Sequence, residues 1–139
     1  MPFEWGPRCV VPTKVLKANE SAVRLQEDFD EVLLEKELKA VGVKGRIVRV
    51  TNPWYYRKKG DYSWIRIGES EDKSRNFAVN WETRNLKDGQ YEVLGLMHVF
   101  VKQDDREEII AGQNITEVKV SSDDDTPWRF GLPQRRIYK

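Results

Sequence analysis

The segment 52–60, NPWYYRKKG, places three aromatic residues directly before three cations. Aromatic rings are platforms on which unpaired bases stack, and lysine and arginine neutralise phosphates and release their counterions. Two more residues of these types, Trp64 and Arg66, follow shortly afterwards. The pattern predicts a surface that binds single-stranded DNA or RNA by stacking and charge neutralisation. In the competing interpretation, at least one of Trp54, Tyr55 and Tyr56 packs in the core or anchors the loop, and the lysines only keep the chain soluble.

The basic residues of the chain are concentrated in its middle third. Residues 44–75 hold nine basic and four acidic side chains, although the net charge of the whole chain is only +1. A local patch of this kind attracts a phosphate backbone, unless acids nearby in space balance it. The predicted nucleic-acid-binding residues are Lys44, Arg46, Arg49, Trp54, Tyr55, Tyr56, Arg57, Lys58, Lys59, Trp64 and Arg66.

The residue types needed for catalysis are scarce. The chain has one histidine, His98, and one cysteine, Cys9. His98 lies within an apolar run that favours a structural role, and Cys9 lies in a segment expected to be an extended arm. There is no glycine-rich phosphate loop, and no carboxylate pair has the spacing of an acid–base couple. The aspartates 123–125 lack the framework of a calcium loop. We therefore expect no enzymatic activity, no metal and no cofactor.

Length and composition predict a single domain with tails. The chain has 139 residues, of which 39% are hydrophobic and 34% charged. One domain takes about 100–200 residues, and a membrane helix needs roughly 18 consecutive apolar residues, which the sequence lacks. The beginning of the sequence lacks the pattern of a secretory signal, and a single cysteine excludes a disulfide framework. These features predict an intracellular location, nuclear or cytoplasmic.

Hydrophobic periodicity predicts one helix followed by strands. Residues 20–40 have apolar side chains at helical spacing, with Ser21 as the cap, although a short strand at 31–34 is an alternative. Asn52-Pro53 is expected to end the first strand and residues 54–61 to form a loop. Phe77 and Trp81 share the phase of Val79 and are predicted core residues. Five strands are expected, at residues 43–50, 62–67, 77–81, 91–102 and 108–120, with a polar hairpin tip between the last two.

These strands resemble the OB-fold family of nucleic-acid-binding proteins over about residues 41–120. The resemblance is carried by VGVKGRIVRV, WIRIGES, NFAVNW, DGQYEVLGLMHVF and EEIIAGQNITEV. It implies a mainly β fold: a five-stranded, Greek-key barrel with an N-terminal helix, binding nucleic acid on its second and third strands and the adjoining loop. The helix usual between the third and fourth strands is replaced by the short link 82–89. Small OB subunits of replication-protein-A-like, telomere-capping and RecQ-associated complexes have a similar plan, which implies a subunit used in genome maintenance.

A β-sandwich is the alternative fold, and a scaffold for protein partners is the alternative function. The run NWETRNLKDGQYEV also resembles a link found in immunoglobulin-like modules. The regions expected outside the domain, 1–19 and 121–139, are an extended arm and a tail, and both carry aromatic residues. Trp, Arg and Phe are enriched at protein interfaces. Trp128, Arg129 and Phe130 are therefore predicted to contact another protein subunit.

Overall fold

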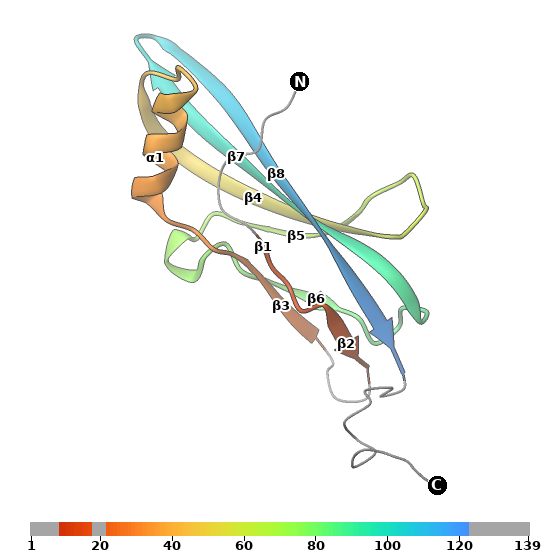
Figure 1. Cartoon of the computed structure of the whole chain (residues 1–139). Helices are drawn as coiled ribbons and strands as arrows, with labels where there is room; N and C mark the ends of the chain where they lie inside the picture. Colours follow the sequence, from red (N-terminus) through yellow and green to blue (C-terminus); the bar gives the residue numbers. More distant parts are fainter. Residues whose placement is uncertain (1–8, 18–21, 123–139) are drawn as a thin grey trace, which may run out of the picture.

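Three long strands form the centre of the molecule. The computed structural model describes residues 9–17 and 22–122. Strands β4 (Arg46–Lys58), β7 (Gly89–Gln103) and β8 (Arg106–Ser121) pair antiparallel in the order β8-β7-β4. β2 (Lys14–Leu16) joins β8 in parallel, and β5 (Ile65–Ser70) joins β4, which completes a five-stranded mixed sheet. Figure 1 shows that this sheet is strongly twisted and curled.

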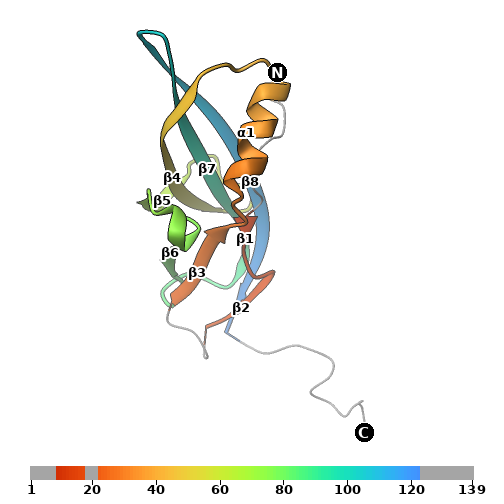
Figure 2. The same ribbon diagram turned by 90° about the vertical axis from the view of Figure 1, so that its left-hand side faces the viewer.

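A smaller sheet and one helix lie on one side of the long strands. The smaller sheet consists of β1 (Cys9–Val10), β3 (Ala22–Glu27) and β6 (Val79–Glu82), in the order β1-β3-β6. Helix α1 (Glu31–Ala40) follows β3, and a short 3-10 helix, η1 (Lys73–Arg75), precedes β6. Figures 1 and 2 show α1, β1 and β3 on the same side of the sheet, which we call its inner face.

The inner face of the sheet carries the core. Along β7, alternate side chains from Tyr91 to Val101 are buried, as the two-residue period of a strand requires. One half of this row packs against β3 and β6 around Trp54 and Trp81. The other half packs against α1 through Leu34 and Leu38, with Phe77 between them. The helix thus covers the part of the inner face that the short strands do not reach.

The predicted helix over residues 20–40 is confirmed only in its second half. Residues 22–27 form β3, in which Val23, Leu25 and Glu27 point inward at 3%, 0% and 1% exposure. This stretch alternates strictly, and the period of two prevails over helical spacing because β6 pairs alongside it. Ser21 lies outside the described residues. The helix cap is Asp30, whose side chain accepts hydrogen bonds from the amides of Val32 and Leu33. The alternative of a strand at 31–34 is wrong.

The predicted break at Asn52-Pro53 and the predicted loop at 54–61 are also wrong. β4 continues to Lys58, and a turn follows. Proline lacks the amide hydrogen that a strand ladder uses. Between β4 and β7, the pairing stops after Thr51, which lies opposite His98, and starts again at Trp54, opposite Gly95. The amide hydrogen that Pro53 lacks therefore falls in a gap of the hydrogen-bond ladder. The basic–aromatic run is therefore mostly strand, and its side chains alternate between two faces.

The remaining expectations about the elements are largely confirmed. β7 and β8 form the predicted hairpin, and Phe77 and Trp81 are buried core residues. The second and third predicted strands are present as β5 and β6 with shifted ends. A mainly β fold with one helix is confirmed within the described residues, and the curled sheet is consistent with a barrel. No helix in the described ranges has the length and apolar character required to cross a membrane.

Tyr91 links the start of β7 to the preceding turn. Its hydroxyl donates a 2.6 Å hydrogen bond to the carbonyl oxygen of Lys87, while its ring is 4% exposed. We expect Tyr91→Phe to lower the free energy of unfolding by about 1 kcal/mol, because one intramolecular hydrogen bond is lost without a cavity. Urea denaturation measures the change. Tyr62→Phe, at a ring that is 97% exposed, is the control and should change nothing. Equal stabilities of the Tyr91 variant and the wild type would contradict this role.

Candidate binding surfaces

Of the three aromatic residues predicted to stack on bases, Trp54 belongs to the core and Tyr56 packs against it. Trp54 is 0% exposed, and its indole Nε1 donates a 2.9 Å hydrogen bond to the carbonyl oxygen of Phe77. The ring of Tyr56 lies on the inner side as well, with its centroid 5.4 Å from that of Trp81. Trp54 is therefore a correction to the predicted nucleic-acid surface, because its ring is fully buried, whereas Tyr56 is partly buried against the same cluster. The expectation that at least one of the three rings is buried is confirmed.

The basic residues of the middle third lie at two distant ends of β4. Lys44, Arg46 and Arg49 are at the start of the strand, and we call them the edge cations. Arg57, Lys58 and Lys59 are at its end, next to the turn that leads to β5. A strand rises about 3.3 Å per residue, so the nearest members of the two groups, Arg49 and Arg57, are separated by about 26 Å along β4. The structure therefore does not gather the predicted cations into one groove.

The second group forms a small patch that we call the hairpin patch, consisting of Arg57, Lys58, Lys59, Tyr62 and Trp64. The Arg57 guanidinium lies 4.1 Å from the centre of the Trp64 ring, and its Nε is 2.8 Å from a Glu92 carboxylate oxygen. Lys59 pairs with Glu117 at 2.6 Å, and this hydrogen bond raises the lysine pKa. Only Lys58 has no ion pair recorded within the described residues, so acids already neutralise much of this patch.

Acids also accompany the other predicted cations. Arg66 is exposed and pairs with Glu69 at 2.8 Å, and the hydrogen bond to Glu69 raises the pKa of Arg66. Arg49 lies 4.1 Å from the centre of the Phe100 ring and 3.9 Å from Glu71. The sequence left open whether the basic patch is balanced by acids nearby in space. Four such pairs, at Arg49, Arg57, Lys59 and Arg66, favour the balanced alternative.

The side of the large sheet opposite the core, which we call the outer face, was not predicted as a surface. Tyr55 lies opposite Leu94, which lies opposite Ile115. Ile115 and Ile109 are 46% and 59% exposed, whereas Leu94 is 7% exposed. The strand alternation that predicts the core also predicts this face. Its members, by register, are Thr51, Tyr55, Leu94, Leu96, His98, Phe100, Ile109, Ala111, Gln113 and Ile115.

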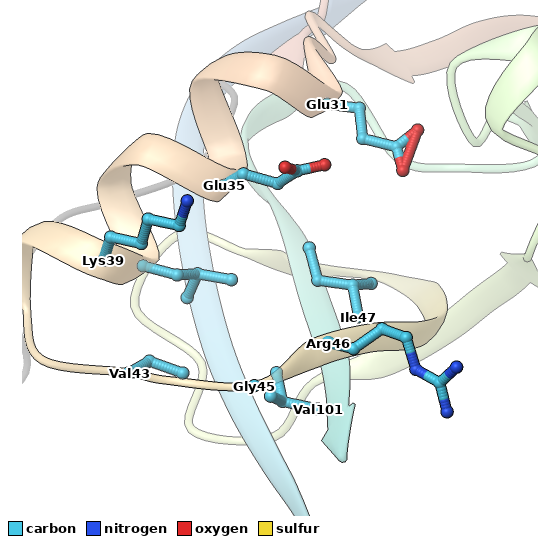
Figure 3. Close-up of a pocket in the computed structure, with 9 residues that line it drawn as sticks. Glu31, Glu35, Lys39, Val43, Gly45, Arg46, Ile47 and Val101 are labelled. Carbon is cyan, nitrogen blue, oxygen red and sulfur yellow. The ribbon is translucent and has the colours of Figure 1, made fainter. Parts of the chain in front are cut away.

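A cleft lies between α1 and the start of β4. Its volume is about 310 Å³, its floor is apolar, and Glu31 and Glu35 of the helix stand on one side. Figure 3 shows the Glu35 carboxylate on the helix side and the Arg46 guanidinium pointing away from the helix. A second cavity of about 210 Å³ adjoins it along β4, between residues 47–50 and the pair Glu71 and Lys73. Sequence reasoning missed both cavities, because the helix and β4 meet only in the folded chain.

A buried polar cluster lies inside the core at Cys9, Glu27 and Asn52. Cys9 belongs to β1 and pairs with Glu27 across the strands, so it is not in an extended arm as expected. Burial raises the pKa of the Glu27 carboxyl to about 7, although hydrogen bonds from Cys9 and Asn52 act in the opposite direction. Burial likewise raises the pKa of the Cys9 thiol. Glu27 Oε1 and Asn52 Oδ1 have no hydrogen-bond partner among the described residues.

Several predicted residues lie beyond what the structure describes. Trp128, Arg129 and Phe130 are outside the described residues, as are the aspartates 123–125. Within residues 9–17 and 22–122, no three His, Cys, Asp or Glu side chains gather in a way that could hold a metal ion. His98 is half-buried on the outer face. No known protein-family model matches the chain, and no curated protein is significantly similar to it.

Proposed function

We propose that the chain is a non-enzymatic, immunoglobulin-like β-sandwich module that works by binding another protein. The fold part of this proposal is supported by strand order. Immunoglobulin-like sandwiches place strands A, B and E in one sheet and G, F and C in the other, with an additional strand beside C in some members. The orders β1-β3-β6 and β2-β8-β7-β4-β5 correspond to this arrangement.

Two side chains add support for the sandwich. Immunoglobulin domains have a buried tryptophan on strand C and a tyrosine near the start of strand F whose hydroxyl bonds to the backbone a few residues earlier. Trp54 on β4 and Tyr91 on β7 occupy the corresponding positions, and the Tyr91 hydroxyl reaches Lys87 four residues upstream. The chain lacks the disulfide of antibody domains, since it contains a single cysteine.

The observation that carries the binding role is the apolar outer face. The described elements that cover the large sheet, α1 and the small sheet, lie on its inner side (Figure 2). The centre of a protein interface is apolar and rich in aromatic residues, and its rim is polar. On the outer face, one apolar row is Tyr55, Leu94 and Ile115, and another is Phe100 and Ile109. The rows between them are more polar, and the Arg57–Glu92 and Lys59–Glu117 pairs border the first row.

A second copy of the chain is the partner that the rim fits best. One end of the outer face is bordered by Arg57, Lys59 and Glu117, and the other by Arg49 and the Lys102–Glu107 pair of facing residues. Both ends therefore carry both signs of charge. A two-fold axis that lies in the interface at right angles to the strands stacks two such faces with opposite ends together, so each charge can meet its opposite in the partner.

Sedimentation of the full chain tests this role. We expect a concentration-dependent dimer, and Ile115→Glu should weaken it at least about tenfold, because a charge then replaces an exposed apolar side chain of the interface. Val32→Glu is the matched control, since Val32 on α1 is 64% exposed and lies away from the outer face. A chain that stays monomeric at high concentration, or a dimer that ignores Ile115→Glu, would overturn self-association through this face.

Binding of single-stranded nucleic acid by an OB-like barrel is the second candidate function. The observation that favours it is the hairpin patch, where the Arg57 guanidinium is stacked on Trp64 and Tyr62, two residues before Trp64, is 97% exposed. A gel shift with short single strands, run on the same samples, separates the two functions. Tight, salt-sensitive binding that Trp64→Ala weakens supports this candidate. Failure to shift any strand at low salt eliminates it.

A further inference from the structure

The first half of β4 has an open edge. β4 pairs with β7 from Arg46 to Lys58, but its pairing with β5 extends only from Asn52 to Tyr56. On the edge away from β7, no strand in the described part of the chain pairs with residues 46–51. Figure 1 shows β5 turning away from β4 toward η1 at this point. Open strand edges present unpaired amides and carbonyls, and an extended peptide can add there as a further strand.

The two sides of this edge differ in chemistry. Arg46 lies opposite Lys102 and Arg49 opposite Phe100, so both arginines are on the outer side. Ile47 lies opposite Val101, on the inner side above the cleft. Val48 forms a bulge between Ile47 and Arg49 and is 44% exposed. Because of this extra residue, Ile47 and Arg49 lie on opposite sides of the strand. Cations therefore line one side of the edge and apolar side chains line the other.

The two cavities lie along this same edge. The larger one, about 310 Å³, has Leu38, Val43 and Ile47 in its lining and is large enough for aliphatic side chains. The smaller one, about 210 Å³, continues along residues 47–50. Pockets beside a strand edge select alternate side chains of an added strand, because successive residues of a strand point to opposite faces.

The charges near the open edge determine which side chains an added strand can place at its other positions. The Lys73–Glu31 pair, at 3.1 Å, joins the segment after β5 to α1 on the far wall of the groove, and the Arg49–Glu71 pair, at 3.9 Å, joins β4 to that segment. Arg46 has no ion pair recorded in the described residues, and Lys44 is exposed next to it. Glu35 and Lys39 of α1 both line the inner side, so this wall carries both signs of charge, whereas Leu38, Val43 and Ile47 give it apolar surface. Acidic side chains thus suit the outer positions of an added strand, and apolar side chains suit the inner ones.

We propose that the open edge of β4, residues 46–51, binds an extended segment of a partner protein in which acidic and apolar residues alternate. The segment continues the line of β5 as an added strand. Its apolar side chains enter the cleft beside α1, and its carboxylates meet Arg46 and compete with Glu71 for Arg49. This inference rests on the proposed protein-binding function but uses a different surface from the outer face.

Synthetic peptides test the proposal. The probe is a fluorescein-labelled ten-residue peptide of alternating glutamate and valine, and its anisotropy is measured with the full chain. Matched probes are alternating lysine and valine, and a block peptide of five glutamates followed by five valines. We expect binding of the alternating acidic peptide only, with slower amide exchange confined to residues 46–51 and the strand beside them.

Charge reversal completes the test. The double variant Arg46→Glu, Arg49→Glu should weaken binding at least about tenfold, because two attractive contacts become repulsive. The control is Arg84→Glu with Lys87→Glu, which reverses two exposed cations in the turn before β7. Equal binding of all three peptides, unchanged affinity in the Arg46 and Arg49 variant, or absence of binding overturns the proposal. The Ile115→Glu variant should still bind the peptide, because Ile115 lies on the outer face and not at the β4 edge. A failure of dimerisation can therefore be distinguished from a failure of peptide binding.

Discussion

The free energy of unfolding is expected to fall by about 3 kcal/mol as the pH rises from 4.5 to 7, because Glu27 has a pKa of about 7 in the folded chain against 4.5 ordinarily. A carboxyl with a raised folded pKa binds more protons when folded than when unfolded. Its contribution to stability is therefore complete below pH 4.5, and it is lost as the pH passes through 7. Above that value the chain folds with an ionised carboxylate in its core.

The cause is the burial of Glu27 without a cation. The residue is 1% exposed, its Oε1 has no hydrogen-bond partner in the described residues, and the titratable group beside it is the Cys9 thiol. Burial raises the pKa of that thiol too, so Cys9 stays neutral and supplies no compensating charge. Asp72 and Asp88 have lowered pKa values because of hydrogen bonds from Ser74 and Ser122, so they titrate below this pH window.

Glu27→Gln isolates the effect. Glutamine keeps the size of the side chain and removes its ionisation, so the decline in stability between pH 5 and 8 should largely disappear. Urea denaturation at several pH values measures both chains, and the variant should be the more stable of the two at pH 8. Glu82→Gln, on the exposed side of β6, is the control and should keep the wild-type decline. Parallel curves for the wild type and Glu27→Gln would show that Glu27 does not ionise in this window.

The parts of the fold that could be predicted from sequence are those in which the spacing of apolar residues fits only one kind of secondary structure. β7 alternates along most of its 15 residues, and a polar tip joins it to β8, which is rich in β-branched residues, so neither helix nor loop competes with the hairpin. The stretch 22–27 is different, because Leu25 fits both a two-residue and a helical spacing. Its pairing with β6, which decides the outcome, comes from residues more than fifty positions later.

The surface around residues 52–60 was harder to predict, because here too distant strands decide the local structure. Residues 52–60 hold turn-forming and charged residues, and their composition favours a loop. β4 continues through Pro53 because it pairs there with distant strands, with β7 on one side and with the short β5 on the other, and no local pattern reveals these partners. Once the segment is a strand, Trp54 and Tyr56 must share the inner side, and only Tyr55 and Arg57 remain on the outer one. The same extension separates the edge cations from the hairpin patch.

Gly95→Ala should destabilise the fold by about 3 kcal/mol, near the upper end of the usual cost of adding a methylene to a packed core. Gly95 lies on the inner side of β7, opposite Trp54. An ideal Cβ there would lie 2.6 Å from Cys9 Sγ, 2.6 Å from Glu27 Oε2 and 3.1 Å from Trp54 Cζ3. Because Glu27 and Trp54 are buried, neither can move aside into solvent. Thermal and urea unfolding measure the loss.

Gly68→Ala is the matched control for this substitution. Gly68 lies opposite Trp54 on the neighbouring strand β5, and an added Cβ would meet only Val79, at 3.6 Å. Its backbone, like that of Gly95, has no positive φ, so alanine should be neutral or stabilise by up to about 1 kcal/mol. Combining Gly95→Ala with Cys9→Ala should recover part of the loss, because removal of Sγ opens the space that the new methyl group needs. If the single and double variants lose the same stability, the contact with Cys9 is not the cause. If Gly95→Ala is as harmless as Gly68→Ala, the close packing of the cluster around Gly95 is refuted.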